Sequence, residues 1–233
     1  MADLSKKEWE KYEEPQESHV YKQIATVMQK GISPDEVAEF YSKWASGLEY
    51  EKELPPDVYN APIITALEAA EGFTDEQKST AKVFDVAAGT GMCAVQLRKH
   101  GFKHIDALDP SQGMLDKAKE KNLYERYICD FITEKPLDIE ENTYDLLTIC
   151  GGMGEGHVPC NALYEMVRLV KPGGRVIIVT KESHRYVTED YKGRLEPLMD
   201  DLEKNGKWTK VKCEIIPEYM KDSDGLVWVF QIC

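Results

Sequence analysis

Residues 83 to 91 read Val-Phe-Asp-Val-Ala-Ala-Gly-Thr-Gly, a short apolar stretch that contains one acid and ends in a glycine-rich turn. A second apolar run, residues 105–108, is followed by another acid, Asp109. In α/β folds, glycines after a strand let the backbone approach a ligand, and an acid after the next strand can accept hydrogen bonds from both ribose hydroxyls. Together these features predict an α/β domain that binds an adenine nucleoside.

An acid inside the first strand distinguishes two such ligands. In register with Gly89 and Gly91, the dinucleotide fingerprint G-x-G-x-x-G would end at Ala94, which that pattern sometimes accepts. Asp85, however, precedes the turn, where its charge would repel a diphosphate and attract the cationic amino group of a methionine moiety. The sequence therefore favours S-adenosylmethionine over NAD.

Length and composition limit the possible architectures. The chain has 233 residues, 42% of them hydrophobic, which suits one α/β domain with an N-terminal extension. Without an apolar run near 20 residues, we expect no membrane span, and the polar residues 1–18 do not resemble a secretory signal. We therefore expect a cytoplasmic protein. The net charge of −13 repels phosphate backbones, so nucleic acid is a poor substrate hypothesis.

The six cysteines do not form a metal-binding pattern. None is in C-x-x-C spacing and no histidine stands at ligand spacing beside them. We therefore expect no zinc site, and we interpret these cysteines as reduced thiols of a reducing compartment.

The N-terminal third is predicted to be helical. Residues 1–17 are expected to be a mobile arm, and an apolar stripe from Val20 to Met28 indicates a helix. Ser33-Pro34-Asp35-Glu36 is a strong helix start, and residues 59–70 predict another helix. We divide the chain into a helical extension or lid, residues 1–78, and a catalytic domain, residues 79–233.

The rest of the chain alternates between strands and helices. We expect strands at 82–86, 104–108, 124–129, 144–150 and 175–180, with helices at 91–100, at 111–122, after Pro159 and at 190–205. Two further strands, 208–216 and 226–232, have no helix between them and must pair antiparallel. The pattern predicts a Rossmann-like, seven-stranded, mostly parallel sheet with a terminal antiparallel hairpin and helices on both faces.

These motifs resemble the class I S-adenosylmethionine-dependent methyltransferases. The family turn is usually D-x-G-x-G-T-G. Asp85, Gly89 and Gly91 match it, whereas Ala87 replaces the first glycine. An alanine is tolerated there if its φ is negative, and it would place the cofactor slightly further out.

Two further segments carry the resemblance beyond this turn. Asp109-Pro110-Ser111-x-x-Met114 is similar to the ribose-binding junction of the family. Asp130-Phe131 resembles the adenine-binding motif, in which the acid accepts from the adenine amino group and the next backbone amide meets a ring nitrogen. The resemblance implies cofactor contacts from these residues and from Cys150 at the end of the fourth strand. Taken alone, Asp130 is interpreted as a turn or helix-capping acid; beside Asp85 and Asp109, it is interpreted as the adenine-binding acid.

A narrower resemblance covers residues 37–232. Three segments are similar to the Williams–Beuren-region methyltransferase-like proteins, the methyltransferase-like protein 27 family: Phe40-Tyr41-x-x-Trp44-Ala45, Tyr59-Asn60-Ala61-Pro62 and Val158-Pro159-Cys160-Asn161-Ala162. The chain departs from that family at residues 47–50, where the family has a Tyr-Asp pair. Tyr41 and Trp44 either close over the cofactor, where an aromatic face would favour the sulfonium, or only pack the N-terminal helix on the sheet.

The loop after the fourth strand is expected to hold the methyl acceptor. It lacks the Asn/Asp-Pro-Pro-aromatic motif of many nucleic-acid amino methyltransferases, and its glycines would leave room for a substrate. Glu155 and His157 are its titratable side chains and the candidate catalytic residues, with His157 either a general base or merely a solvated loop residue. We expect a small-molecule or protein acceptor. The alternative is a non-catalytic cofactor-binding protein that acts through partners.

Overall fold

The computed structural model describes residues 19–47 and 50–233, so the arm expected at residues 1–17 lies outside the described residues. One seven-stranded sheet has the order β3-β2-β1-β4-β5-β7-β6. Its strands are β1 (Lys82–Val86), β2 (His104–Leu108), β3 (Arg126–Ile128), β4 (Tyr144–Cys150), β5 (Val170–Lys181), β6 (Trp208–Met220) and β7 (Ser223–Ile232). This order confirms the predicted class of fold.

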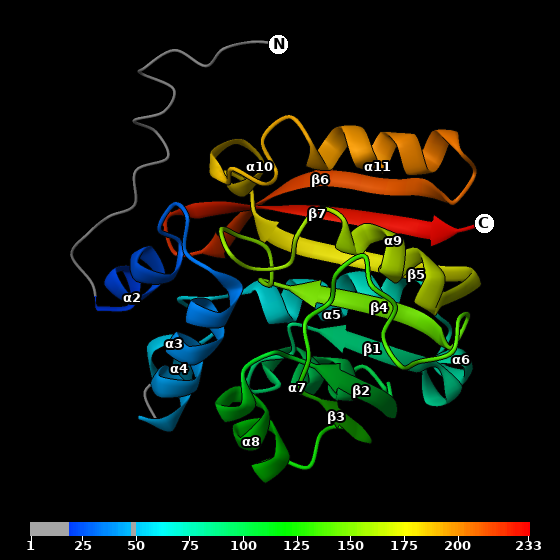
Figure 1. Ribbon diagram of the computed structural model, residues 1–233. Helices are drawn as coiled ribbons and strands as arrows, with labels where there is room; N and C mark the ends of the chain where they lie inside the picture. Colours follow the sequence, from blue (N-terminus) through cyan, green and yellow to red (C-terminus); the bar gives the residue numbers. More distant parts are fainter. Residues whose placement is uncertain (1–18, 48–49) are drawn as a thin grey trace.

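Most strands run in one direction. β1 pairs parallel with both β2 and β4, and β4 pairs parallel with β5. β7 pairs antiparallel with β5 and with β6, as its reversed arrow shows (Figure 1). The predicted terminal hairpin is therefore present, and Asp222 makes its turn with a φ of +63°.

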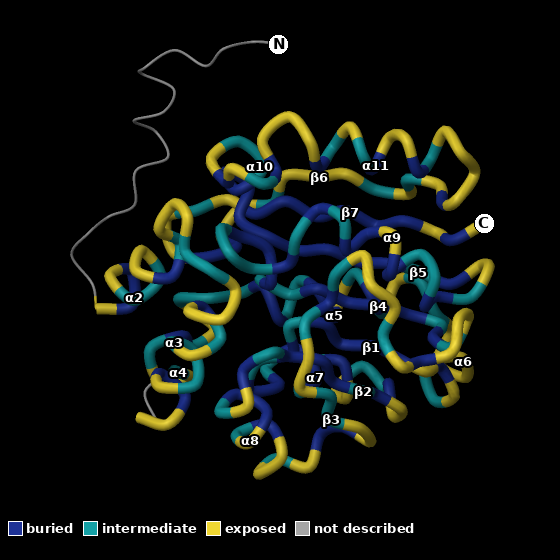
Figure 2. The backbone as a smooth tube through the Cα atoms, in the orientation of Figure 1, coloured by how far each residue is buried: buried dark blue, intermediate teal, exposed yellow. Residues whose placement is uncertain are grey.

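Helices cover both faces of the sheet. The helices are α2 (His19–Val27), α3 (Pro34–Ser46), α4 (Tyr50–Glu53), α5 (Ala61–Glu71), α6 (Asp75–Thr80), α7 (Met92–Lys99), α8 (Gln112–Glu120), α9 (Ala162–Leu169), α10 (His184–Val187) and α11 (Leu195–Lys204). Neighbouring residues of β1 enter different cores, since Val83 packs in one apolar cluster and Phe84 in the other. The buried strands lie between two layers whose outer surfaces are exposed (Figure 2).

Some elements differ in length from the prediction. β3 is shorter than expected because Tyr124 leaves the strand and turns its hydroxyl to Asp85, 2.7 Å away. β5 begins at Val170, before the expected start at residue 175, with a pairing irregularity between Tyr144 and Leu146 of β4. The helix expected over residues 190–205 is the shorter α11.

The N-terminal helices lie beside the carboxyl edge of the sheet. Figure 1 shows α2, α3 and α4 on the side to which the arrows of β1 and β4 point. The predicted start of α3 is confirmed: the Ser33 side chain accepts from the Glu36 amide, and the Glu36 carboxylate accepts from the Ser33 amide at 2.9 Å. In the described part of the chain, no helix combines the length and apolar character needed to cross a membrane.

Candidate functional site

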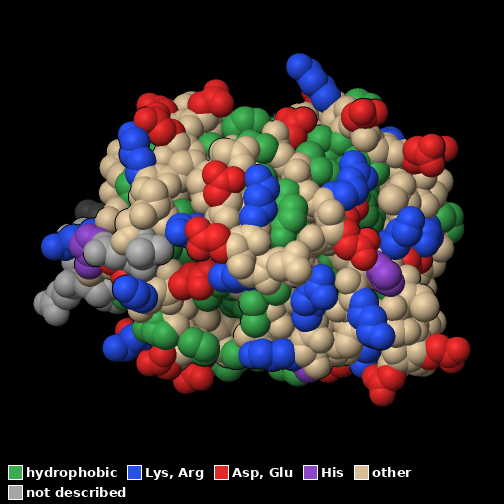
Figure 3. Space-filling model, turned by 90° about the horizontal axis from the view of Figure 1, so that it is seen from below, with side chains coloured by type: hydrophobic (Ala, Val, Ile, Leu, Met, Phe, Trp, Pro, Cys, Tyr) green, Lys and Arg blue, Asp and Glu red, His purple; other side chains and the backbone are tan. Residues whose placement is uncertain are grey.

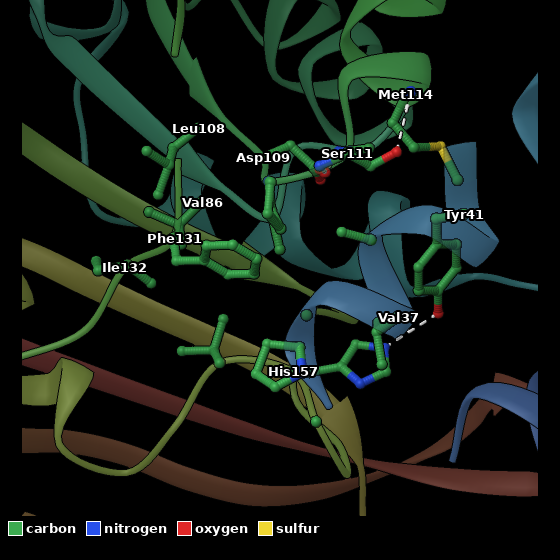
Figure 4. Close-up of a pocket in the computed structure, with 18 of the residues that line it drawn as sticks. Val37, Tyr41, Val86, Leu108, Asp109, Ser111, Met114, Phe131, Ile132 and His157 are labelled. Atoms are coloured by element: carbon green, nitrogen blue, oxygen red, sulfur yellow. Dashed lines mark hydrogen bonds between the residues drawn. The ribbon is translucent and has the colours of Figure 1, made fainter. Parts of the chain in front are cut away.

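A cleft of about 370 Å³ lies between α3 and the carboxyl ends of β1, β2 and β4. Nine of the residues predicted from the sequence line it: Tyr41, Ala87, Gly89, Asp109, Pro110, Met114, Phe131, Cys150 and His157. Figure 4 shows the Phe131 ring projecting into this space, with Tyr41 and Val37 of α3 on the opposite side. Residues from five separate parts of the sequence thus meet in one cavity.

Asp109 is held at the floor of the cleft. One carboxylate oxygen accepts from the Gly89 amide at 2.8 Å and the other from the Ser111 amide at 2.8 Å. Burial raises the pKa of Asp109 to about 6, against the opposing effect of these two donors. Each carboxylate oxygen can accept a second hydrogen bond, so the oxygens retain the capacity to bind a pair of ribose hydroxyls.

Ala87 adopts a conformation that we did not expect. Its φ is +55°, so the expectation of a negative φ was wrong. A left-handed conformation costs an L-residue about 1–2 kcal/mol. The methyl group is accommodated because Gly152 faces it: a Cβ at Gly152 would lie 2.5 Å from the Ala87 Cβ. The turn therefore keeps its glycine-like shape without its first glycine.

Asp85 lies beneath the cleft and does not line it. Its two oxygens accept from the Tyr124 hydroxyl at 2.7 Å and the Thr148 hydroxyl at 2.8 Å. Burial raises its pKa to about 6. These contacts show a buried acid that ties β1 to β4 and to Tyr124, one layer below the turn.

Gly91 and Trp44 are also absent from the lining. Gly91 caps the start of α7 with a φ of +87°, and a Cβ there would lie 2.7 Å from the Leu123 side chain, so internal packing requires this glycine. Trp44 is buried behind Tyr41, with the two rings stacked at 6.1 Å, and its indole donates to Glu53 at 3.0 Å.

Asp130 is exposed at the rim, and Phe131 takes the position in the cleft. The Phe131 amide donates to the Asp130 carboxylate at 2.8 Å. The side chain of Phe131 thus offers a flat apolar surface in the cavity, while its backbone amide is held by the neighbouring acid.

His157 and Tyr41 form a contact across the cleft. The His157 Nδ1 lies 2.6 Å from the Glu155 carbonyl oxygen, which can only accept, so Nδ1 carries the proton. Nε2 therefore accepts from the Tyr41 hydroxyl at 3.2 Å (Figure 4). Burial lowers the pKa of His157, which keeps the ring neutral.

Glu155 lies outside the cleft. Its carboxylate accepts from the Gly31 amide at 3.3 Å and the Glu189 amide at 3.0 Å, and it lines a separate polar cavity of about 750 Å³. These contacts connect the N-terminal helices to the segment after β5.

The glycines of the loop after β4 make room for the protein itself. A Cβ at Gly151 would lie 2.0 Å from the Tyr59 hydroxyl, and one at Gly156 would lie 2.8 Å from the Ile32 carbonyl. A side chain at either position would therefore collide with the N-terminal segment, although Gly151 and Gly156 also line the cleft.

α3 is docked on α8 by small residues. The Ser42 hydroxyl lies 2.7 Å from the Ser111 hydroxyl and accepts from the Gly113 amide at 3.3 Å. A Cβ at Gly113 would lie 2.8 Å from the Ser42 Cα. Because the Ser111 amide also donates to Asp109, this contact connects α3 to the acid at the floor of the cleft.

Two tyrosines at the cleft were not predicted from the sequence, because they come together only in three dimensions. Tyr59 lines the cleft, and Tyr219 packs against it from the end of β6. Tyr59 had a signal in the family-like Tyr-Asn-Ala-Pro run, whereas Tyr219 had none. Within residues 19–47 and 50–233, no group of three His, Cys, Asp or Glu side chains is placed to hold a metal ion.

Comparisons with known proteins identify relatives of this chain. The profile of the methyltransferase domain family matches residues 83–174. Human methyltransferase-like protein 27 is 35% identical over 169 residues, which span 72% of this chain and 66% of that protein. The demethylmenaquinone methyltransferase of Corynebacterium efficiens is 39% identical over 97 residues, 42% of this chain and 40% of that enzyme. The match thus covers less than the full length of these relatives.

Solved structures share the fold at low sequence identity. A TehB-like S-adenosylmethionine-dependent methyltransferase from Corynebacterium glutamicum superposes with a TM-score of 0.56 at 17% identity, covering 83% of this chain and 98% of that one. An S-adenosylmethionine-dependent methyltransferase from Aquifex aeolicus gives a TM-score of 0.56 at 16% identity over 82% and 98%. From its sequence motifs, strand order and relatives, this chain belongs to the class I S-adenosylmethionine-dependent methyltransferases.

Proposed function

We propose that this protein transfers the methyl group of S-adenosylmethionine directly to a small molecule or a protein side chain. When bound, the cofactor supplies an activated methyl group on a sulfonium. The observation that carries the proposal is the pairing of Asp109 with the Gly89 turn in a cleft that, among the described residues, no Lys or Arg lines. The carboxylates of Asp35 and Asp109 line this cleft, so its charge disfavours a diphosphate and favours a sulfonium cation.

A second cavity extends from the cleft beside the glycine-rich turn, in the direction that we assign to the methionine part of the cofactor. It measures about 30 Å³, adjoins the cleft through Ala87, Gly89 and Cys150, and is also lined by Thr90. The buried Thr90 hydroxyl has no hydrogen-bond partner within the described residues. Because buried polar atoms are normally paired, this hydroxyl is available to a polar group of a bound ligand.

The roles assigned to the site residues follow from these positions. In this proposal Asp109 holds the ribose, Phe131 and Met114 cover the adenine, and Asp130 accepts from the adenine amino group. Asp85 supports the turn from below. We assign residues 1–78 to an N-terminal extension and residues 79–233 to the catalytic domain. Within the extension, the segment 20–59 acts as a lid, because α3 lines the cleft and carries Tyr41.

Charge supports an acceptor other than nucleic acid. The net charge is −13, and on the face seen from below Lys and Arg side chains are interspersed with Asp and Glu (Figure 3). Binding to a phosphate backbone depends on clustered cationic side chains. A small molecule or a protein side chain fits this surface better.

Calorimetry with the purified protein tests cofactor binding. We expect S-adenosylmethionine and S-adenosylhomocysteine to bind and NAD to bind negligibly. Asp109→Ala removes the partner of two hydrogen-bonding hydroxyls and should weaken binding by about 1–3 kcal/mol. Equal affinity in the variant would refute the assignment.

Untargeted metabolite profiling, with and without the active protein, tests methyl transfer. Methylated products that depend on the protein support catalysis. Cofactor binding without any methylated product among metabolites or proteins would favour the non-catalytic alternative.

A further inference from the structure

Three cavities meet at Tyr50 and Tyr59. Both side chains line the 370 Å³ cleft, the 30 Å³ cavity beside the turn, and a third cavity of about 60 Å³. Under the proposed function, the first holds the nucleoside and the second lies on the side of the methionine moiety. The third cavity opens from the same junction, next to Gly151 at the end of β4.

Aromatic side chains dominate this third cavity, which we name the tyrosine cavity. Its rings are Tyr41, Trp44, Tyr50, Tyr59 and Tyr219. The Tyr41 and Tyr50 rings meet edge to face at 6.3 Å, and Trp44 and Tyr50 do so at 4.9 Å. The faces and hydroxyl oxygens of such rings attract a positive charge that water no longer screens.

Neither the two tyrosines Tyr50 and Tyr59 nor His184 is an effective base in the tyrosine cavity. Burial raises the pKa values of Tyr50 and Tyr59 well above the usual range, so both hydroxyls keep their protons. Burial lowers the pKa of His184, which also lines the cavity, to about 3, so this imidazole is neutral near pH 7 and a weak base. An alcohol must lose its proton to attack the methyl group, and these side chains do not accept that proton readily. A neutral amine already carries a nucleophilic lone pair and needs no base.

We propose, as an extension of the methyltransferase function above, that the tyrosine cavity is the acceptor subsite and that it takes an aliphatic amine. The nitrogen lone pair forms the new bond to the methyl carbon. The carbon–sulfur bond breaks with its electron pair going to sulfur, which becomes a neutral thioether. The nitrogen becomes an ammonium ion and later gives its extra proton to water. The aromatic rings face the nitrogen as this positive charge develops.

The size and surroundings of the cavity agree with this assignment. A volume of 60 Å³ admits the end of a molecule rather than a nucleobase, so the amine is small or terminal. Lys181 and His184 line both this cavity and the polar cavity of about 750 Å³, so the two adjoin. A longer acceptor can extend from the tyrosine cavity into that polar space.

A mimic of the product complex tests the proposal. The full chain is saturated with S-adenosylhomocysteine and titrated with trimethylammonium, followed by saturation-transfer NMR of its methyl protons. The matched probe is 2-propanol, which has a similar branched skeleton without charge. We expect trimethylammonium to bind about 2- to 30-fold more tightly than 2-propanol, the range of a desolvated cation–π contact.

Variants identify the location of the bound cation. Tyr219→Leu removes a ring of the cavity and should weaken trimethylammonium binding by the same factor. Tyr219→Phe keeps the ring and should retain binding, as should Tyr164→Leu, a matched control at a tyrosine of α9 that is 52% exposed. The comparison of the two probes uses the unaltered protein, so its result does not depend on whether any variant folds.

The possible outcomes separate the two proposals. If S-adenosylhomocysteine itself does not bind, the proposed function fails. If it binds while trimethylammonium is undetected, or binds no better than 2-propanol, only the amine assignment is overturned. Unchanged trimethylammonium binding in a Tyr219→Leu protein that retains S-adenosylhomocysteine affinity also overturns it.

Discussion

Tyr59 and Tyr219 meet edge to face, with their ring centroids 5.6 Å apart. The contact exists because the segment before α5 pairs with the end of β6: the Asn60 amide donates to the Tyr219 carbonyl at 3.0 Å, and the Lys221 amide donates to the Val58 carbonyl at 2.8 Å. The terminal hairpin therefore helps to shape the site, although it lies far along the chain from the glycine-rich turn.

Gly113→Ala should loosen the contact of α3 with α8. The added Cβ would lie 2.8 Å from the Ser42 Cα and 2.9 Å from its carbonyl oxygen, so the helices must separate. We expect faster hydrogen exchange in α3 and weaker S-adenosylhomocysteine binding, even though alanine favours the helix α8 itself by about 1 kcal/mol.

Ser42→Ala is the matched control for this lid prediction. It removes the hydroxyl contacts with Ser111 and Gly113 but adds no atom between the helices. Its effect on hydrogen exchange should be smaller. If cofactor protects the turn at residues 87–91 and leaves α3 unchanged, the segment 20–59 is a packing element and not a lid.

Cofactor affinity should fall below about pH 6. Because the pKa of Asp109 is raised to about 6, the carboxylate is ionised above that pH and protonated below it. Ribose hydroxyls donate to the ionised form, so binding of S-adenosylhomocysteine should be constant above about pH 7 and weaken as pH decreases. Calorimetry from pH 5 to pH 8 measures this. Asp109→Asn cannot titrate and should lose that pH dependence.

The same raised pKa values affect stability in the opposite sense. Asp85 and Asp109 bind protons more tightly in the folded protein than in the unfolded chain, so the free energy of unfolding should decrease as pH rises from about 4 to about 6. Denaturant titrations of the cofactor-free protein check this sign. Asp85→Asn should reduce the slope of the free energy of unfolding against pH. An unchanged slope would show that other groups cause this pH dependence.

Ala87→Gly should stabilise the protein. Glycine removes the cost of the left-handed conformation at φ +55°, and we expect a gain of up to about 1 kcal/mol in the free energy of unfolding. Ala88→Gly is the matched control, because Ala88 is buried and has no positive φ. That variant should destabilise by about 1 kcal/mol, and similar losses for both variants would contradict the strain argument.

His157 and Glu155 should respond differently to mutation. If His157 is a general base, His157→Ala lowers turnover about 10²- to 10⁴-fold with cofactor affinity little changed. Glu155→Gln should instead cost about 1 kcal/mol of stability, because it weakens the contacts with the Gly31 and Glu189 amides. Unaltered turnover in both variants, on any acceptor found by profiling, would leave catalysis to alignment of the substrates.

The sequence alone determined the fold and the edge of the sheet at which the predicted site residues meet. Strand ends such as Val86 and Leu108 could be located because apolar runs stop at turn residues, and parallel strands bring their carboxyl ends to one edge. For the same reason the sequence pattern assigns Gly89, Asp109 and Phe131 to one cleft, and all three line it. These features depend on local pattern and on general rules of α/β topology.

Only the tertiary structure decided which side chains face the cleft. Asp85 and Gly91 match the motif as well as Gly89 does, yet neither lines the cleft. The carboxylate of Asp85 accepts hydrogen bonds from the Tyr124 and Thr148 hydroxyls. The Leu123 side chain packs against Gly91. Tyr219 joins Tyr59 through pairing between distant segments, which no local pattern encodes. Such contacts depend on how separate elements pack, because the direction and partners of each side chain are fixed only when the whole chain is folded.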